Sequence, residues 1–207
     1  MMVAFFVFQH RLCMRLAFLE GNMPKIYIDQ GHNPENPNAG AEGNGLLEQN
    51  ITYRVGIELA NLLRRNPDYE VRLSRPTATT SLGTSNSTSL RARVEDANAW
   101  GADYFISIHT NASSNPQARG VEAFAYSEPS RAFSLGESIV KNLSEATGFL
   151  DRGMKTRPGL YVLRRTNMPA VLVEIGFITN PEEAALMNSN PELFARGIYN
   201  GIIEYLG

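Results

Sequence analysis

Cysteine is nearly absent from this sequence, whose 207 residues include a single one, Cys13. One cysteine forms no internal disulfide, so the fold depends on a buried core, and a chain of this length can supply one. The sequence also lacks an excess of basic residues, since its formal net charge is −2. Without a basic field to attract phosphate groups, we expect no nucleic-acid partner.

Long hydrophobic runs are missing as well, which bears on the first 22 residues. The apolar stretch Met1–Phe8 is too short to span a bilayer, and Arg11 follows it rather than preceding it as in a signal peptide. We therefore expect no transmembrane segment and no convincing signal peptide. Residues 1–22 either precede the true initiator, Met23, or form an amphipathic surface helix or a degenerate leader. The folded domain is expected over residues 23–207.

Apolar residues and turn signals along the rest of the chain follow a strand–helix order. The expected strands lie near residues 25–29, 69–74, 103–108, 121–126, 159–163 and 170–175. The expected helices lie near residues 47–66, 90–100 and 131–147, from 180 onward and from 190 to 206, with loops at 30–46, 75–88 and 110–119. Strands that alternate with helices indicate parallel pairing. The sequence therefore predicts a single three-layer α/β/α domain with a twisted, mainly parallel sheet.

Histidine is scarce too, and two of the three histidines follow patterns typical of buried strands. The patterns of interest are Ile26–Asp29 before His32, Tyr104–Ile108 before His109, and Ala170–Val173 before Glu174. In α/β sheets, ligands bind outside the carboxyl ends of the strands. Three strands that carry metal-binding or acid–base side chains to that edge predict a zinc hydrolase.

A further metal ligand is needed, because zinc in hydrolases is typically held by three protein ligands, for example two histidines and a glutamate. Glu48 is the best candidate, since it opens the helix after the first loop and is held rigidly there. Glu35 and Glu42 lie mid-loop among Gly, Asn and Pro and are less well placed.

Each of these residues alone also has a structural interpretation. A histidine at a strand end is more often a hydrogen-bonded structural residue, and a glutamate in the first turn of a helix favours the helix dipole. Glu174 is harder to explain in this way. A carboxylate inside an apolar run is costly unless it reaches an edge or a partner.

Five short motifs occur in order along the chain. They are Asp29-Gln30-Gly31-His32, Leu47-Glu48-Gln49-Asn50, Ser74-Arg75-Pro76, Ser107-Ile108-His109-Thr110-Asn111 and Val173-Glu174-Ile175-Gly176-Phe177-Ile178-Thr179-Asn180. Together they resemble the zinc-dependent N-acetylmuramoyl-L-alanine amidases of the amidase 3 type, over roughly residues 25–206. Gln30 departs from the family, which usually has proline before Gly-His, but Gly31 is kept.

The resemblance implies a twisted mixed sheet flanked by helices, with one Zn²⁺ in an open groove. His32, Glu48 and His109 would be its ligands and Glu174 the catalytic carboxylate. Asn111 and Arg75 are candidates for substrate binding, although structural roles are favoured for both, with Arg75 paired to an acid beneath the sheet.

Peptidoglycan is the partner that the resemblance implies. The bond cut would be the amide between the lactyl group of N-acetylmuramic acid and the L-alanine of the stem peptide. Such an enzyme acts on the cell wall, outside the cytoplasm or in the periplasm, and without a signal peptide it would be released by another route. Cell separation, spore processing and phage-type lysis all stay open as roles, as does the oligomeric state.

Two other functions use the same residues. A zinc peptidase or carboxypeptidase would need a pocket for a free carboxylate, and the sequence marks none clearly. A non-catalytic, zinc-containing module that binds the cell wall should lack the general base, whereas Glu174 is present in its full motif.

Overall fold

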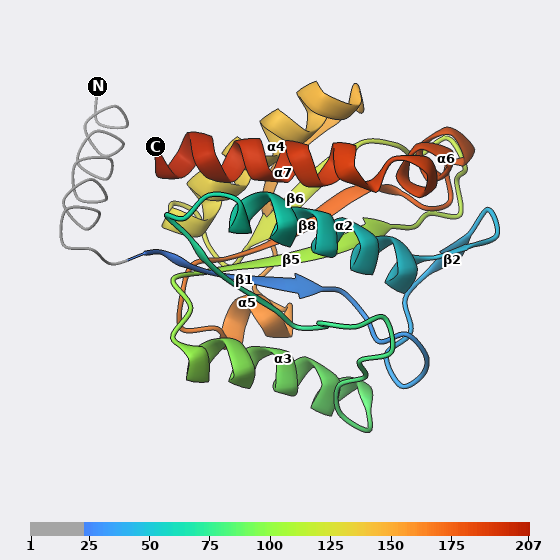
Figure 1. The fold of residues 1–207 in the computed structure, drawn as a ribbon. Coiled ribbons are helices and arrows are strands. Elements are labelled where there is room, and N and C mark those ends of the chain that lie inside the picture. Colours follow the sequence, from blue (N-terminus) through green and yellow to red (C-terminus); the bar gives the residue numbers. More distant parts are fainter. Residues whose placement is uncertain (1–22) are drawn as a thin grey trace.

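The computed structural model describes residues 23–207 and centres on a six-stranded sheet with the order β4-β1-β5-β8-β6-β7 (Figure 1). Its strands are β1 (Lys25–Gln30), β4 (Glu70–Leu73), β5 (Tyr104–Asn111), β6 (Val121–Ala125), β7 (Asp151–Thr156) and β8 (Ala170–Phe177). The helices are α2 (Glu48–Arg64), α3 (Asn86–Trp100), α4 (Arg131–Thr147), α5 (Tyr161–Arg165), α6 (Pro181–Ser189) and α7 (Pro191–Leu206). A hairpin of β2 (Glu42–Gly43) and β3 (Leu46–Leu47) precedes α2.

The sheet reverses direction once. Strands β4, β1, β5 and β8 pair in parallel, β6 pairs antiparallel with β8, and β7 pairs parallel with β6. The predicted α/β fold with a mainly parallel sheet is confirmed. Because of the reversal, the carboxyl end of β8 lies beside the beginning of β6.

Helices cover both faces of the sheet, with α2, α4 and α7 on one side and α3 and α5 on the other (Figure 1). The side chains of β1 show how both faces are filled. Ile26 and Ile28 pack into the core beneath α2 and α7, whereas Tyr27 points the other way and stacks on Phe105 at 5.4 Å between ring centroids. Burial on both faces explains the continuous apolar runs of the central strands. Among the described helices, none is long and apolar enough to cross a membrane.

Some local expectations are wrong. The strand expected near residues 159–163 is helix α5, because an apolar run this short has no periodicity that separates helix from strand. Strand β7 was not predicted, since its sequence DRGMKT is polar and it is an edge strand. The hairpin of β2 and β3 forms at the end of the expected loop 30–46 and includes Leu47, where the helix was expected to begin. The interpretations of residues 1–22 concern a segment outside the described residues.

A buried ion pair joins α3 to the end of β1. Arg93 Nη1 lies 2.5 Å from Asp29 Oδ1, and both side chains are at most 2% exposed. Burial raises the pKa of Asp29, but the Arg93 charge and the hydrogen bonds from Arg93 and Ser107 outweigh it and hold this pKa below its usual range. The same guanidinium donates to the carbonyl oxygens of Gln30 at 2.7 Å and His32 at 2.6 Å.

Removing the arginine charge should destabilise the fold strongly. In Arg93→Met, Asp29 would be left as a buried, unpaired carboxylate, and we expect the free energy of unfolding to fall by about 3–5 kcal/mol in urea titrations followed by circular dichroism. The control is Arg72→Met, which breaks the exposed pair of Arg72 with Asp96 and should cost less than about 1 kcal/mol. Similar small losses in both variants would contradict this role of Arg93.

Candidate metal centre and active site

The three strand-end residues predicted from the sequence meet at one edge of the sheet. His109 in β5 pairs in register with Glu174 in the neighbouring strand β8, so both side chains project to the same face. His32 follows β1, the other neighbour of β5. The rings of His32 and His109 lie 4.9 Å apart between centroids, at an interplanar angle of 79°.

Glu48 completes the group from the first turn of α2. Its Oε2 lies 3.1 Å from His32 Nε2, and its Oε1 lies 3.1 Å from His109 Nδ1. One ligand atom from each of these three residues can be chosen so that all lie within 4.8 Å of one another. The carboxylate is 4% exposed, whereas the two histidines are 20% and 18% exposed. Glu35 and Glu42, the rival carboxylates, are exposed and lie outside this group.

Backbone N–H groups hold the Glu48 carboxylate in place. The N–H of Ala41 donates to Oε2 at 2.8 Å, and the N–H of Thr110 donates to Oε1 at 2.9 Å. The N–H of Glu48 in turn donates to the carbonyl oxygen of Ala41 at 3.0 Å, directly beside the hairpin of β2 and β3. The hairpin thus gives the first turn of α2 a fixed position, as a metal ligand requires.

His32 has an unusual backbone conformation for a residue with a side chain. Its φ is 69°, in the left-handed region that non-glycine residues rarely adopt. Its carbonyl oxygen accepts from Arg93 Nη2 at 2.6 Å and from Arg75 Nη1 at 3.4 Å. Two buried arginines therefore hold the turn that aims the imidazole at Glu48.

The charges of the group suit a bound cation. Burial raises the pKa of Glu48, but hydrogen bonds from His109 and His32 outweigh it and hold this pKa well below its usual range. Burial lowers the pKa of His109, and the bond to Glu48 outweighs it, so this pKa is raised. His32 Nδ1 is buried without a hydrogen-bond partner in the described part of the chain. A carboxylate facing two imidazoles, with one ring nitrogen unpartnered, fits a divalent metal ion.

Glu174 is poised to exchange protons beside this group. Burial raises the pKa of Glu174 to about 7; the His109 and Arg157 charges oppose the rise, and the Glu48 and Glu122 charges add to it. Its Oε2 is buried with no hydrogen-bond partner among residues 23–207. The free oxygen and near-neutral pKa are what a general acid or base needs at neutral pH.

Arg75 and Asn111, the two candidates for substrate binding, make side-chain hydrogen bonds inside the protein, while Nε of Arg75 is buried without a partner in the described chain. Arg75 is buried and donates to the carbonyl oxygens of Gln49 at 2.9 Å and Ala78 at 3.1 Å. Its partners in the described chain are carbonyl groups rather than the acid expected from the sequence. Asn111 Nδ2 donates to Glu122 Oε1 at 2.5 Å.

Gln30, where the family usually has proline, joins two strand ends. Its side-chain oxygen accepts from the N–H of Arg75 at 2.9 Å, and its amide nitrogen donates to the carbonyl oxygen of Arg75 at 3.0 Å. Gly56 in α2 leaves room for this buried side chain, because a Cβ there would overlap Gln30 Cγ. The departure at Gln30 is therefore accommodated without displacing His32.

Glu122 is a neighbour of Glu174 that the sequence analysis does not identify. It pairs in register with Glu174 across β6 and β8 and is buried. Lys155 Nζ and Arg152 Nε, both from β7, contact its Oε2, the arginine at 3.2 Å. Burial raises the pKa of Glu122, but these two cations outweigh it and lower the pKa. A single glutamate in the apolar strand Val121–Ala125 is the only sequence signal for it.

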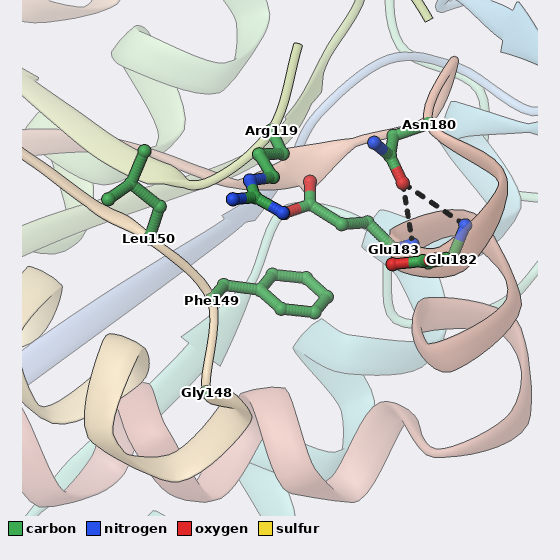
Figure 2. A pocket seen from close by; sticks show the side chains of 7 residues that line it. All are labelled: Arg119, Gly148, Phe149, Leu150, Asn180, Glu182 and Glu183. Carbon is green, nitrogen blue, oxygen red and sulfur yellow. Dashed lines mark hydrogen bonds between the residues drawn. The ribbon is translucent and has the colours of Figure 1, made fainter. Parts of the chain in front are cut away.

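A cavity of about 330 Å³ lies apart from these residues, between the end of α4 and the start of α6 (Figure 2). Its lining residues are Arg119, Gly148, Phe149, Leu150, Asn180, Glu182 and Glu183. Asn180 caps α6 by accepting from the N–H groups of Glu182 and Glu183. Glu183 accepts from the N–H groups of Gly120 and Phe177, both at 2.7 Å. These contacts fix the end of β8 beside the start of β6.

Comparison with known proteins agrees with the fold and the site. The N-acetylmuramoyl-L-alanine amidase family Amidase_3 matches residues 26–204. The chain is 38% identical over 185 residues to N-acetylmuramoyl-L-alanine amidase CwlM of Bacillus licheniformis, covering 87% of this chain and 68% of that protein. It is 36% identical over 186 residues to the sporulation-specific N-acetylmuramoyl-L-alanine amidase of Bacillus subtilis (strain 168), covering 87% and 67%.

A solved structure gives the same result. The catalytic domain of CwlV, an N-acetylmuramoyl-L-alanine amidase from Bacillus (Paenibacillus) polymyxa, matches with a TM-score of 0.78 at 32% identity, covering 89% of this chain and 98% of that one. The chain therefore belongs to the N-acetylmuramoyl-L-alanine amidase family of cell-wall hydrolases, as the five motifs predicted.

Gly31 offers a test of the metal centre, because a side chain there would displace His109. A Cβ on Gly31 would lie 2.5 Å from His109 Cε1, 2.7 Å from His109 Nε2 and 2.6 Å from the carbonyl oxygen of Ile108. We expect Gly31→Ala to fold but to bind Zn²⁺ roughly 10–100-fold more weakly in equilibrium dialysis, like other changes that disturb ligand orientation. Gly159→Ala is the control, since its Cβ meets nothing within 4 Å. Equal affinity in the two variants would argue against a site at His109.

Proposed function

We propose that this chain is a zinc-dependent N-acetylmuramoyl-L-alanine amidase. It hydrolyses the amide between the lactyl group of N-acetylmuramic acid and the L-alanine of the stem peptide in peptidoglycan. The proposal rests on one observation above all: Glu174 keeps a buried, unpartnered carboxylate oxygen and lies in register with His109. Family membership supports the choice of bond. Because that bond lies in the cell wall, the enzyme would act outside the cytoplasm.

One zinc ion is proposed to bind His32, Glu48 and His109. Two histidines and one glutamate form a ligand set of catalytic zinc, which leaves a position open. A zinc ion in such a site supplies Lewis acidity, which polarises a carbonyl group and lowers the pKa of water from about 15.7 toward about 7. The backbone N–H groups of Ala41 and Thr110 keep the Glu48 carboxylate oriented throughout.

Glu174 is proposed to carry the proton. As a carboxylate, it accepts a proton from the water that attacks the carbonyl carbon, and it then delivers this proton to the nitrogen of the leaving L-alanine. The C–N bond breaks, the amine leaves as a neutral primary amine, the OH from water stays on the acyl carbon as a carboxylic acid, and Glu174 returns to its starting charge. Its pKa of about 7, which burial raises, suits both halves of this transfer.

Asn111 and Arg75 are proposed to shape the site rather than to bind substrate. The two terminal nitrogens of Arg75 donate to carbonyl groups around His32, and the amide nitrogen of Asn111 donates to Glu122. The first set of contacts holds the turn at His32 and the start of α2, and the second joins β5 to β6 beside Glu174. In this view, the substrate meets mainly Glu174 and the face of the sheet beyond it.

Product analysis tests the bond and the metal together. Purified peptidoglycan incubated with the zinc-loaded protein should release peptides that begin with L-alanine and leave intact glycan strands, as read by mass spectrometry. Protein treated with a chelator should release none until zinc is restored. Cleavage inside the peptide would instead identify a peptidase. Bound zinc without any cleavage would identify a binding module or an enzyme that needs an activator.

Removal of the proposed acid–base group should separate chemistry from metal binding. We expect Glu174→Gln to keep its zinc, measured by plasma mass spectrometry, while turnover falls about 10²–10⁴-fold. Glu42→Gln, which alters an exposed carboxylate in the hairpin, is the control and should match the wild type. Turnover near the wild-type value in Glu174→Gln would exclude Glu174 from the mechanism. Loss of zinc from this variant would make it a metal ligand instead.

A further inference from the structure

Arg157 lies on the same face of the sheet as Glu174, but it plays no part in the proposed chemistry. The guanidinium carbon of Arg157 lies 5.1 Å from the ring centroid of Phe124 in β6. Phe124 and Glu122 are two positions apart in β6, so their side chains project to one face, and Glu122 pairs with Glu174. Arg157 therefore covers the floor of the sheet next to the proposed acid–base group.

The guanidinium of Arg157 has no ion pair or hydrogen bond within residues 23–207, and its position is nevertheless fixed. Its backbone N–H donates to the carbonyl oxygen of Ala125 at 2.8 Å, and its carbonyl oxygen accepts from Leu160 at 3.1 Å. A cation held over an aromatic ring keeps its orientation with its planar N–H groups free. The charge also reaches the active centre, because it is among those that counter the burial-driven rise in the pKa of Glu174.

Two more cations flank this position. Lys155 pairs in register with Phe124, and Lys155 and Arg152 share one oxygen of Glu122. The side chains of Lys155 and Arg152 are 44% and 34% exposed. Three cations against two carboxylates, Glu122 and Asp151, leave β6 and β7 net positive, whereas the adjacent centre holds Glu174 and Glu48. An anionic group of a ligand is thus favoured over β6 and β7 and disfavoured at the centre.

We propose that Arg157, with Lys155 beside it, binds a carboxylate group of the stem peptide and so selects acidic peptides over their amidated forms. The inference rests on the proposed function and adds the substrate class that the site prefers. A guanidinium matches a carboxylate with two parallel hydrogen bonds, which a carboxamide cannot accept equally well.

The distance between the two sites suits a short stretch of peptide. The guanidinium of Arg157 lies over Phe124, which is one strand across from β8 and two residues along β6 from Glu122, the partner of Glu174. Adjacent strands lie about 4.8 Å apart and a strand rises about 3.3 Å per residue, so the guanidinium lies roughly 8–10 Å from Glu174. An extended peptide advances about 3.3–3.6 Å per residue. A carboxylate within about three residues of the scissile amide therefore reaches Arg157 while the amide nitrogen is beside Glu174.

Two matched substrates test the inference. One is a muramoyl tripeptide with free carboxylates, and the other is the same compound with these groups converted to amides. The wild type should prefer the acid, and Arg157→Gln should lower kcat/KM for the acid roughly 10- to 100-fold, mainly through KM, as expected for loss of a charge-assisted hydrogen-bond pair. The amidated substrate should be cut equally well by both proteins. Arg157→Lys should recover part of the loss, and Arg196→Gln, which alters an exposed pair on α7, should change nothing.

Binding of the free tripeptides, acid and amide, by calorimetry separates this inference from the proposed function. If the wild type binds the acid tripeptide more tightly than the amidated one, and Arg157→Gln loses this preference, the role of Arg157 is supported even without any cleavage of substrate. Absence of cleavage would then count only against the amidase proposal. Equal binding of acid and amide to the wild type would overturn it. So would an equal loss on both substrates in Arg157→Gln, which would make Arg157 part of the chemistry or the fold.

Discussion

The buried charge of Arg93 is the constraint on which the rest of the site depends. Its guanidinium joins α3 to the end of β1 through Asp29 and through the carbonyl oxygens of Gln30 and His32. An arginine this deeply buried is tolerable only with all these acceptors in place. The same contacts stabilise the left-handed backbone of His32, which would otherwise be unfavourable. Stability of the sheet edge and geometry of the metal group therefore share one set of hydrogen bonds.

Much of this arrangement was predictable because strand ends in α/β sheets converge. His32, His109 and Glu174 each follow an apolar run long enough to identify a buried strand, and Glu48 opens a helix with a clear 3.6-residue period. Strand β7 was not predictable, because an exposed edge strand needs no apolar residues and its sequence DRGMKT has the composition of a loop. The role of Glu122 was hidden for the same reason, since its partners Arg152 and Lys155 lie on that strand.

The face of the sheet at its active edge carries charges that would be unfavourable in isolation. Glu122 and Glu174 are directly paired across β6 and β8, where like charges destabilise a sheet. The two carboxylates have different surroundings. Glu122 receives two cations and an amide, which hold its pKa low, whereas Glu174 has a buried oxygen with no partner in the described chain, and burial raises its pKa to about 7. The surroundings alone thus shift the pKa values of two neighbouring carboxylates in opposite directions, which suits Glu122 to a structural role and Glu174 to the chemical role proposed for it.

The order of the strands also sets the order of the charged groups across the sheet. Across the sheet, the metal group lies over β1 and β5, Glu174 over β8, and the cations over β6 and β7. In the proposed reaction Glu174 protonates the leaving nitrogen, so the amine side of the substrate would lie on the β8 side of the candidate metal group. With the peptide extending from there over β6 and β7, as proposed, the lactyl group and its glycan strand would lie on the side of the loop after β1. Because direction reverses once between β8 and β6, strands β6 and β7 begin at the edge where the parallel strands end, and this places Glu122 and its partner Arg152 beside Glu174.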